Sequence, residues 1–363
     1  MEYRRNRRTG DSISVLGMGT SYIAEASMPD GIAAIRRAYE GGVNYFDLAA
    51  GGPKAFLYMG EALKDVRKEV RFQIHFGANY ESGTYGWTTS ADTVKRSIAW
   101  QLDQLKTDYI DYGFIHCLDE ASDWADYKRG GALKYLMELK EQGVVRHIGL
   151  SSHTPSTAML VMDEVPLDML MFSINPGYDY HHGEYAKGSA DERSALYRRC
   201  EREGVGISVM KPFSGGQLLD AGVSPFAQAL TQYQCIQYAL DRPGVLTVLP
   251  GANSVQQVEQ LLRFFETSEA QRDYSVIGSF RPSDAAGKCV YCNHCKPCPK
   301  GIDVGLVNKY YDLARNGDGM AARHYHGLEV RADACVNCGH CNSRCPFGVD
   351  QMSRMKEIAG YFA

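Results

Sequence analysis

The stretch Val43-Asn-Tyr-Phe-Asp47 is a short apolar strand that ends in a carboxylate, and a helix signal from Pro53 to Leu63 follows it. The same strand-and-helix unit recurs on both sides of this stretch. A short hairpin within residues 1–20 leads into a first buried strand at Val15, which brings the number of units to eight. This alternation predicts a closed (β/α)8 barrel. The alternative is an open doubly wound sheet, but no G-x-G-x-x-G turn follows an early strand.

The other elements of the predicted barrel are short and regularly spaced. Further strands are expected at Arg71–His75, Ile110–Ile115, His147–Leu150, Met169–Ser173, Gly206–Met210 and Leu246–Leu249. Further helices are expected at Asp30–Tyr39, Ala91–Leu105, Ala132–Glu141, Ser156–Asp163, Asp191–Glu203, Pro225–Leu240 and Ser254–Phe265.

Polar side chains end seven of the predicted strands. In a (β/α)8 barrel the C-terminal ends of the strands meet at one mouth, where the chemistry of these folds lies. A single polar residue at a strand end is often structural, but seven polar strand ends at one mouth favour a functional site. They are Asp47, His75, His116, the run Ser151-Ser152-His153, Asn175, Lys211, and Gly251 with Asn253.

Eight of the eleven cysteines form two runs near the C-terminus. The run from Cys335 to Pro346 has the full bacterial-ferredoxin spacing, and the run from Cys289 to Pro299 has one residue fewer before its last cysteine. In this pattern three thiolates bind one 4Fe–4S cluster and the fourth crosses to the other cluster. We therefore expect two clusters. The expected ligands are Cys289, Cys292, Cys295 and Cys345 for one cluster, and Cys335, Cys338, Cys341 and Cys298 for the other.

Zinc and disulfides are the alternative uses of such cysteines. Zinc sites usually take cysteines in pairs and stop at four ligands. Disulfides need an oxidising compartment, and no apolar signal core follows the arginines of the N-terminus. We expect the cytoplasm of an anaerobic bacterium, where thiols stay reduced and clusters persist.

Length and charge limit the number of domains and the kinds of partner. A chain of 363 residues can hold one barrel and a small appendage. We expect the barrel at residues 1–267, a linker at 268–287 and a mostly helical cluster domain at 288–363, with helices at Val304–Arg315 and Met320–Leu328. The net charge of −4 indicates neither nucleic-acid nor membrane binding. The sequence is compatible with a homo-oligomer.

Several stretches resemble the aldo-keto reductases. They are Ser14–Thr20, Gly42–Asp47, Tyr58–Leu63, Thr107–Asp111 with His116, Val145–Ser152, Met210–Gly216 and Leu249–Ala252. Together with the C-terminal cysteines, they make the chain resemble the bacterial branch that carries a 4Fe–4S ferredoxin-type domain behind the barrel. The resemblance implies a tetrad of Asp, Tyr, Lys and His, in which the tyrosine protonates a carbonyl as hydride arrives from a nicotinamide.

The two central members of that tetrad are missing from this sequence. Asp47 and His116 fall on the first and last positions, but Gly52 stands at the tyrosine position and His75 at the lysine position. A phenol with a pKa of ~10 needs a nearby cation to act near neutral pH. The residue that donates the proton in the family is therefore absent from this sequence, and the difference is more than a shift in its pKa.

The nicotinamide contacts implied by the resemblance are also altered. Met210 replaces the usual stacking aromatic residue, and Gln257 stands near the expected cation for a 2′-phosphate. Ser254 still begins a helix whose backbone N–H groups could hold a phosphate. The residues that would contact NAD(P)H are Ser152, Asn175, Lys211, Asn253, Ser254 and Gln257.

Asp47, His75 and His116 remain as the candidate catalytic residues. Histidine suits acid–base chemistry near neutral pH, so we expect one imidazole to move a proton while Asp47 orients it. A metal site made of two histidines and one carboxylate is the alternative use of the same residues. Substitute phenols are sought at Tyr58, Tyr178 and Tyr180, and a substrate wall at Tyr80, Tyr85 and Trp87.

The leading functional hypothesis is an iron–sulfur oxidoreductase. Its barrel would bind a small organic substrate, and its clusters would exchange electrons with that substrate and with a ferredoxin, a flavoprotein or a nicotinamide. One alternative is an NAD(P)H-dependent carbonyl reductase with structural clusters. The others are a non-redox lyase or isomerase that uses the two histidines, and an electron carrier built on a degenerate barrel.

Overall fold

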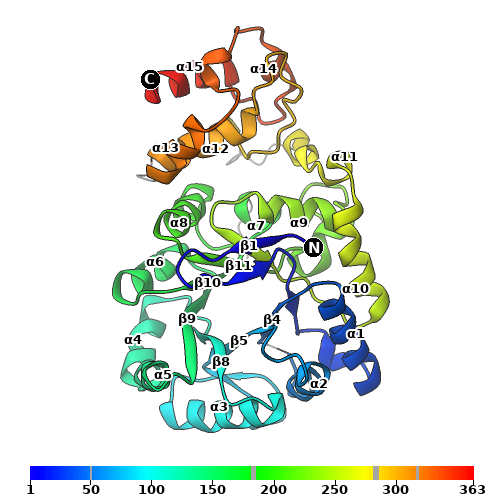
Figure 1. The fold of residues 1–363 in the computed structure, drawn as a ribbon, viewed down its shortest axis with the longest axis vertical. Coiled ribbons are helices and arrows are strands. Elements are labelled where there is room, and N and C mark those ends of the chain that lie inside the picture. Colours follow the sequence, from blue (N-terminus) through cyan, green and yellow to red (C-terminus); the bar gives the residue numbers. More distant parts are fainter. Residues whose placement is uncertain (50, 181–184, 281–285, 316–318) are drawn as a thin grey trace.

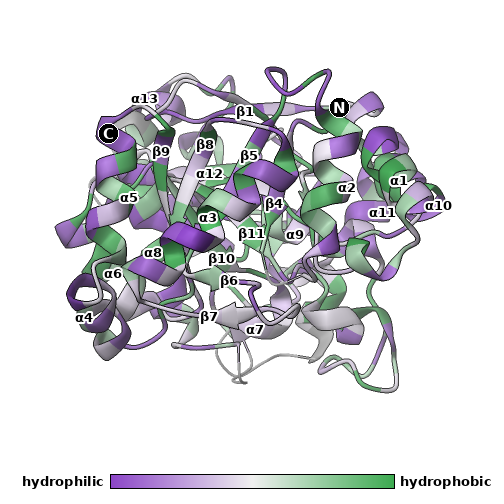
Figure 2. Ribbon diagram, turned by 90° about the horizontal axis from the view of Figure 1, so that it is seen from below, coloured by the Kyte–Doolittle hydropathy of each residue, from purple (hydrophilic) through white to green (hydrophobic). Residues whose placement is uncertain are grey.

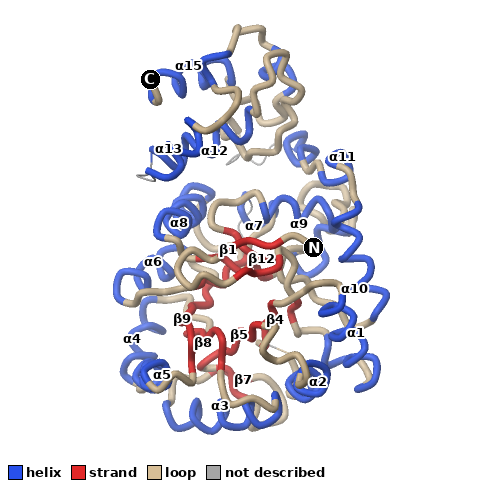
Figure 3. Tube along the Cα trace, in the orientation of Figure 1, coloured by secondary structure: helices blue, strands red, loops and turns tan. Residues whose placement is uncertain are grey.

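The computed structural model describes residues 1–49, 51–180, 185–280, 286–315 and 319–363. Its main sheet is a ring of parallel strands in the order β12-β11-β10-β9-β8-β5-β4-β3, surrounded by helices (Figures 1 and 3). Bridges from Leu16 to Val248 and from Gly19 to Gly251 join the first and last strand segments. The eight strands thus form a nearly closed barrel, which confirms the predicted (β/α)8 fold.

The helices and strands alternate along the barrel. The strands are β3 (Met18–Gly19), β4 (Tyr45–Leu48), β5 (Arg71–Phe76), β8 (Ile110–Ile115), β9 (Val145–Ser152), β10 (Met169–Ser173), β11 (Gly206–Met210) and β12 (Val245–Val248). The helices are α1 (Met28–Glu40), α2 (Lys54–Leu63), α3 (Ala91–Leu105), α4 (Ala121–Arg129), α5 (Ala132–Glu141), α6 (Pro155–Glu164), α7 (Pro176–Tyr180), α8 (Ala190–Glu203), α9 (Gln232–Leu240) and α10 (Val255–Leu262).

Side-chain caps decide where some of these helices begin. Ser189 and Glu192 form a reciprocal capping box at the start of α8. A second box, between Thr231 and Gln234, starts α9 at Gln232. The helix start predicted at Pro225 was therefore too early, because the box fixes the first turn further along the chain.

The interior of the barrel is a packed core, and a hairpin covers one end of it. The hairpin pairs β1 (Tyr3–Arg5) with β2 (Ser12–Ser14) and lies across the barrel in Figure 1. Arg4 donates hydrogen bonds to the carbonyl of Leu240, the last residue of α9, and to that of Val245, the first residue of β12. The apolar side chains that pack together in this core are Ile13, Tyr45, Tyr112, Phe114, Met169, Met171, Met210, Leu246 and Leu249.

A small antiparallel hairpin follows β5 and reaches the mouth of the barrel. It consists of β6 (Ala78–Asn79) and β7 (Gly86–Trp87), and Figure 2 shows the two strands below the barrel strands. Gly77 precedes it with φ of +134°, and a Cβ there would lie 3.0 Å from the Cβ of His116. Glycine therefore allows the hairpin to pass close to His116.

The cluster domain packs against the side of the barrel. It contains α12 (Val304–Arg315), α13 (Gly319–His326), α14 (His340–Arg344) and α15 (Gln351–Tyr361), and Figure 1 shows it beyond α8 and α11. Val290, Phe347 and Val349 belong to the same continuous core as the barrel. The helical character predicted for this domain is confirmed.

The segment expected to be a linker is largely built into the fold. Residues 268–280 contain α11 (Glu269–Arg272) and the 3-10 helix η4 (Ser275–Phe280), while residues 281–285 lie outside the described part of the chain. Tyr274 and Ile277 are fully buried in the barrel core. This packing holds the cluster domain in a fixed place against the barrel.

Replacing Phe347 with alanine tests this shared core. Phe347 is 2% exposed, so the substitution should cost about 3–5 kcal/mol in the free energy of unfolding through a cavity. Because the core is continuous, barrel and cluster domain should melt together at a lower temperature in anaerobic calorimetry. Val336→Ala, at a 54% exposed position, should change stability by less than about 0.5 kcal/mol. Two separate transitions with an unchanged barrel would contradict a shared core.

Candidate active site

Four side chains at the barrel mouth form one continuous chain of hydrogen bonds. Asp47 and His75 lie one residue before the ends of β4 and β5, His116 follows β8, and Tyr85 lies on the turn between β6 and β7. The His75 Nε2 to Asp47 Oδ1 distance is 2.8 Å, and the two Nδ1 atoms of His75 and His116 are 2.9 Å apart. The Tyr85 hydroxyl lies 2.7 Å from His116 Nε2. The sequence prediction that Asp47, His75 and His116 meet agrees with this geometry.

The carboxylate fixes the direction of every hydrogen bond in this chain. An ionised Asp47 can only accept, so His75 carries its proton on Nε2 and leaves Nδ1 as an acceptor. His116 must then donate from Nδ1, which leaves its Nε2 to accept from the Tyr85 hydroxyl. Each group thus donates to the next, from the phenol inward to the carboxylate. Such a series can pass a proton without moving heavy atoms.

The inner and outer ends of the hydrogen-bond chain differ in how deeply they are buried. His75 is fully buried and His116 is 3% exposed, whereas Tyr85 is 37% exposed. Burial, reinforced by the charges of His75 and then His153, holds the pKa of His116 well below its usual value, so its imidazole is neutral near pH 7. Tyr85 is therefore the member of the chain that meets a substrate first.

Gln73 and Trp87 hold the two ends of the chain in place. Gln73 accepts hydrogen bonds from Tyr45 (2.8 Å) and Ser208 (3.0 Å), and these orient its Nε2 to donate to Asp47 Oδ1 at 2.8 Å. Trp87 donates from Nε1 to the carbonyl of His116 at 3.1 Å, which ties the hairpin to the mouth. Sequence reasoning missed the role of Gln73, although it lies two residues before His75 on the same face of β5.

The phenol at the outer end of this chain is Tyr85, and not Tyr58, Tyr178 or Tyr180, where a substitute phenol was expected. Tyr58 is buried on α2 and its hydroxyl lies 3.4 Å from the carbonyl of Ala26. Tyr180 packs at the other end of α7, beside Cys289. Burial raises the pKa of Tyr85, and the charges of Cys117 and Asp119 raise it further, so the phenol stays protonated.

The alternative reading of Asp47, His75 and His116 as a metal site is not supported. A metal needs the three groups to converge, but here they are joined in series. His75 uses Nε2 on Asp47 and Nδ1 on His116, so neither ring nitrogen is left for a metal. The arrangement favours proton transfer.

A second polar group lines the same mouth. Cys117 Sγ, an oxygen of Asp119 and a ring nitrogen of His153 all lie within 4.8 Å of one another. Asp119 accepts from His153 Nδ1 at 2.9 Å and from the backbone N–H of His153 at 2.6 Å. Burial raises the pKa of the Cys117 thiol to about 12, and Asp119 raises it as well. These contacts tie the loops after β8 and β9 together.

The residues expected to contact a nicotinamide are engaged with the protein itself. Asn175 donates from Nδ2 to the carbonyl of Lys211 at 2.8 Å, and the Lys211 ammonium lies 3.0 Å from the ring centroid of Tyr185. Ser152 is fully buried and its hydroxyl lies 3.3 Å from the carbonyl of Thr154.

The predicted phosphate site at the start of α10 is closed by local caps. Gln257 Oε1 accepts from the backbone N–H of Asn253 at 2.9 Å, and the Ser254 hydroxyl accepts from the N–H of Gln257 at 3.4 Å. A phosphate would have to displace these side chains.

The cysteines gather in two groups, as the crossed pattern predicts. One cavity of the cluster domain is lined by all four thiols of the expected second group, with apolar walls from Ile302, Val304, Met352 and Met355. The thiols that line it are Cys298, Cys335, Cys338 and Cys341. This donor set and its apolar walls fit a 4Fe–4S cluster, which we call the distal cluster.

The other four cysteines lie together against the barrel. Cys289, Cys292 and Cys345 pack on the barrel core, and Cys295 is buried beside them. Burial raises the pKa of the Cys292 thiol to about 12, and the charges of Cys289 and Cys345 raise it further. Cys345 of the second run thus lies with the cysteines of the first run, and we call the site that they form the proximal cluster. None of the cysteines forms a disulfide.

Comparison with known proteins assigns both parts of the chain. A model of the aldo/keto reductase family matches residues 15–231, which is more than half of the chain. The chain belongs to the aldo/keto reductase family. A second model, described as a 4Fe-4S dicluster domain, matches residues 285–349. The protein is thus an aldo/keto reductase with an iron–sulfur domain, as the resemblance implied.

Individual relatives of this aldo/keto reductase are distant. L-galactose dehydrogenase of Arabidopsis thaliana is 26% identical over 291 residues, covering 72% of this chain and 86% of that protein. The uncharacterized oxidoreductase YqkF of Bacillus subtilis is 24% identical over 289 residues, covering 70% and 89%. The structure of aldo-keto reductase AKR11C1 from Bacillus halodurans (holo form) is similar in fold, with a TM-score of 0.62 and 21% identity, covering 77% and 96%. No helix in the described part of the chain is long and apolar enough to cross a membrane.

Replacing Cys298 with alanine tests the shortened cysteine run. Anaerobically purified protein should contain about eight irons per chain, and the variant about four, because only the distal cluster depends on this thiol. Iron and acid-labile sulfide analysis measures both. Cys235→Ala, a fully buried barrel thiol, should leave the iron content unchanged. An unchanged iron content in Cys298→Ala would show that the shortened run does not bind a cluster as assigned.

Proposed function

We propose that this aldo/keto reductase is an iron–sulfur oxidoreductase that reduces a small organic carbonyl compound at the barrel mouth, or oxidises the corresponding alcohol. The observation that carries the proposal is the hydrogen-bond chain from Tyr85 to Asp47, which stands where the family tetrad has lost its tyrosine and lysine. The family match supports the reaction class, and the unusual mouth sets the residues that perform it.

Tyr85 is the proton donor in this proposal. Carbonyl reduction would start from the chain with a proton on Asp47 and its hydrogen bonds turned outward, so that Tyr85 gives its proton to the carbonyl oxygen and takes one from His116 Nε2 as the two imidazoles pass the Asp47 proton outward. In the direction of alcohol oxidation every transfer reverses, and the proton ends on the Asp47 carboxylate.

Reduction of a carbonyl to an alcohol takes two electrons and two protons. The bound clusters would supply the electrons, one at a time, Tyr85 would supply the proton on oxygen, and water at the exposed end of the chain would supply the proton on carbon. Asn175 at the end of β10 lies at the mouth, and the single turn α7 runs from Pro176 to Tyr180. A helix of five residues is about 7.5 Å long, and Tyr180 lines the same cavity as Cys289. This short link between mouth and proximal cluster supports an electron path through the domain boundary.

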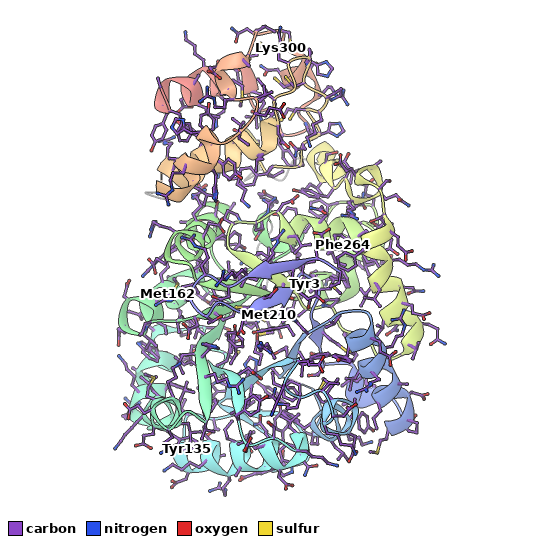
Figure 4. All side chains as sticks on the ribbon, in the orientation of Figure 1. Tyr3, Tyr135, Met162, Met210, Phe264 and Lys300 are labelled. Atoms are coloured by element: carbon purple, nitrogen blue, oxygen red, sulfur yellow. The ribbon has the colours of Figure 1, made fainter. Side chains whose placement is uncertain are left out.

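An electron-transfer partner would dock at the distal cluster. Cys338 is exposed, Val336 beside it is 54% exposed, and Lys300 lines the same cavity. Figure 4 shows Lys300 at the end of the cluster domain far from the barrel. A small redox protein such as a ferredoxin or flavoprotein suits this edge, because electron-transfer encounters bury little surface.

A conventional NAD(P)H-dependent carbonyl reductase is the second candidate. The family match favours it, and the Tyr85 acid would serve hydride transfer equally well. The caps at Asn253 and Gln257 and the bond from Asn175 to Lys211 weigh against it, because a dinucleotide would have to break them.

Replacing Tyr85 with phenylalanine removes the proposed acid and keeps the ring. We expect kcat to fall about 10²–10⁴-fold with little change in KM, because general acid catalysis contributes that much to the rate. Tyr22→Phe, at a 46% exposed position beside Gly251 at the same mouth, should keep its activity. If Tyr85→Phe and Tyr22→Phe turn over at equal rates, the proton comes from another group.

The choice of electron donor separates the two candidate functions. Anaerobic assays with carbonyl substrates should show turnover with dithionite-reduced methyl viologen and none with NADH or NADPH alone. The Cys298→Ala variant should lose the viologen-driven activity, because its distal cluster is missing. Turnover with NAD(P)H that survives the loss of that cluster would instead identify the conventional reductase.

A further inference from the structure

A cavity lies between the two domains, away from the barrel mouth. It measures about 240 Å³ and opens between α8 and the first cysteine run. Ser194 and Arg198 line it from α8, Arg242 lines it from the turn before β12, and Cys289 lines it from the cluster domain. Water occupies ~30 Å³ per molecule, so the cavity has room for about eight waters or a small organic molecule.

Two arginines in this cavity lack a carboxylate partner among the described residues. Arg198 donates from Nη1 to the Ser194 hydroxyl at 2.8 Å, and its buried Nε has no hydrogen-bond partner. Arg242 is 5% exposed and uses Nε and Nη2 on Tyr238, Tyr274 and the carbonyl of Val290. Its Nη1 has no partner in the described part of the chain.

The other charged groups around the cavity are already paired. Lys288 contacts Asp191 at 2.7 Å, Arg354 pairs with Asp312, and Asp179 is held by Arg193 at 2.8 Å. Among the described residues Arg198 thus has no paired carboxylate, and Arg242 reaches the carboxylate of Asp241 only through the hydroxyl of Tyr274. A buried N–H without an acceptor costs free energy, and a guanidinium binds carboxylate and phosphate groups in a two-pronged geometry. The cavity is thus built to accept an anion.

We propose that this cavity binds a small anion with a carboxylate or phosphate group, held between Arg198 and Arg242. Its walls come from both domains, so the ligand links the barrel to the cluster domain. It also lies beside Cys289, where a negative charge opposes the addition of an electron to the proximal cluster. Occupancy therefore lowers the reduction potential of that cluster and sets when electrons reach the barrel.

Calorimetric titration of the anaerobic holoprotein with inorganic phosphate and, separately, with succinate tests the site. Saturable one-to-one binding of one probe is expected, and the two arms separate phosphate from carboxylate chemistry. Arg198→Gln should weaken binding at least about ten-fold, since a charge-assisted hydrogen bond is lost. Arg198→Lys keeps the charge and should lose less. Arg199→Gln is the matched control, because Arg199 follows Arg198 in the sequence but pairs with Asp163 and Glu203 instead.

Redox titration followed by electron paramagnetic resonance provides the second measurement. The binding probe should lower the potential of one cluster in the native chain and leave it unchanged in Arg198→Gln. Absence of saturable binding by both probes would overturn the site, as would equal binding by Arg198→Gln. In a third outcome, the native chain binds neither probe, yet the cluster potential of Arg198→Gln differs from that of the native chain. Arg198 would then act on the cluster only through its own charge, and this too would overturn the site.

Discussion

The hydrogen bond between His75 Nε2 and Asp47 is the contact on which the chemistry of the mouth depends. It fixes the tautomer of His75, and through it the donor and acceptor roles of His116 and Tyr85. Gln73 holds the carboxylate from the other side, so the direction of the chain is set inside the barrel core. A mouth that lacks two tetrad members thus keeps an oriented series of hydrogen-bond donors.

The second constraint is the continuous core beneath both domains. Val290, Phe347 and Val349 pack with barrel residues, and Tyr274 is buried between the domains. The proximal cysteines are therefore placed by the same hydrophobic packing that places the strands. The distal cysteines line a cavity in a small core of their own, with Cys338 at the surface. One end of the cluster domain faces the catalytic barrel and the other faces solvent.

Periodicity and spacing were enough to predict the barrel, the cysteine grouping and the meeting of Asp47 with the two histidines. These features follow from local patterns, since strand ends converge in any such barrel. Tyr85 could not be recognised in this way, because it lies on a hairpin whose path over the mouth depends on Gly77 and Trp87. The caps on Asn253 and Gln257 likewise arise from side-chain geometry that residue spacing does not encode.

The position of Tyr85 on the β6–β7 turn has an evolutionary consequence. The proposed acid is carried by this turn, whereas Asp47 and His75 belong to the strands themselves. Substitutions at Tyr85, which is 37% exposed, can therefore change the proposed acid with little effect on packing, whereas Ala78 and Tyr80 of the same hairpin are buried in the barrel core. The proposed proton donor and the buried relay behind it are thus held by different parts of the fold, a surface turn and the strands of the barrel.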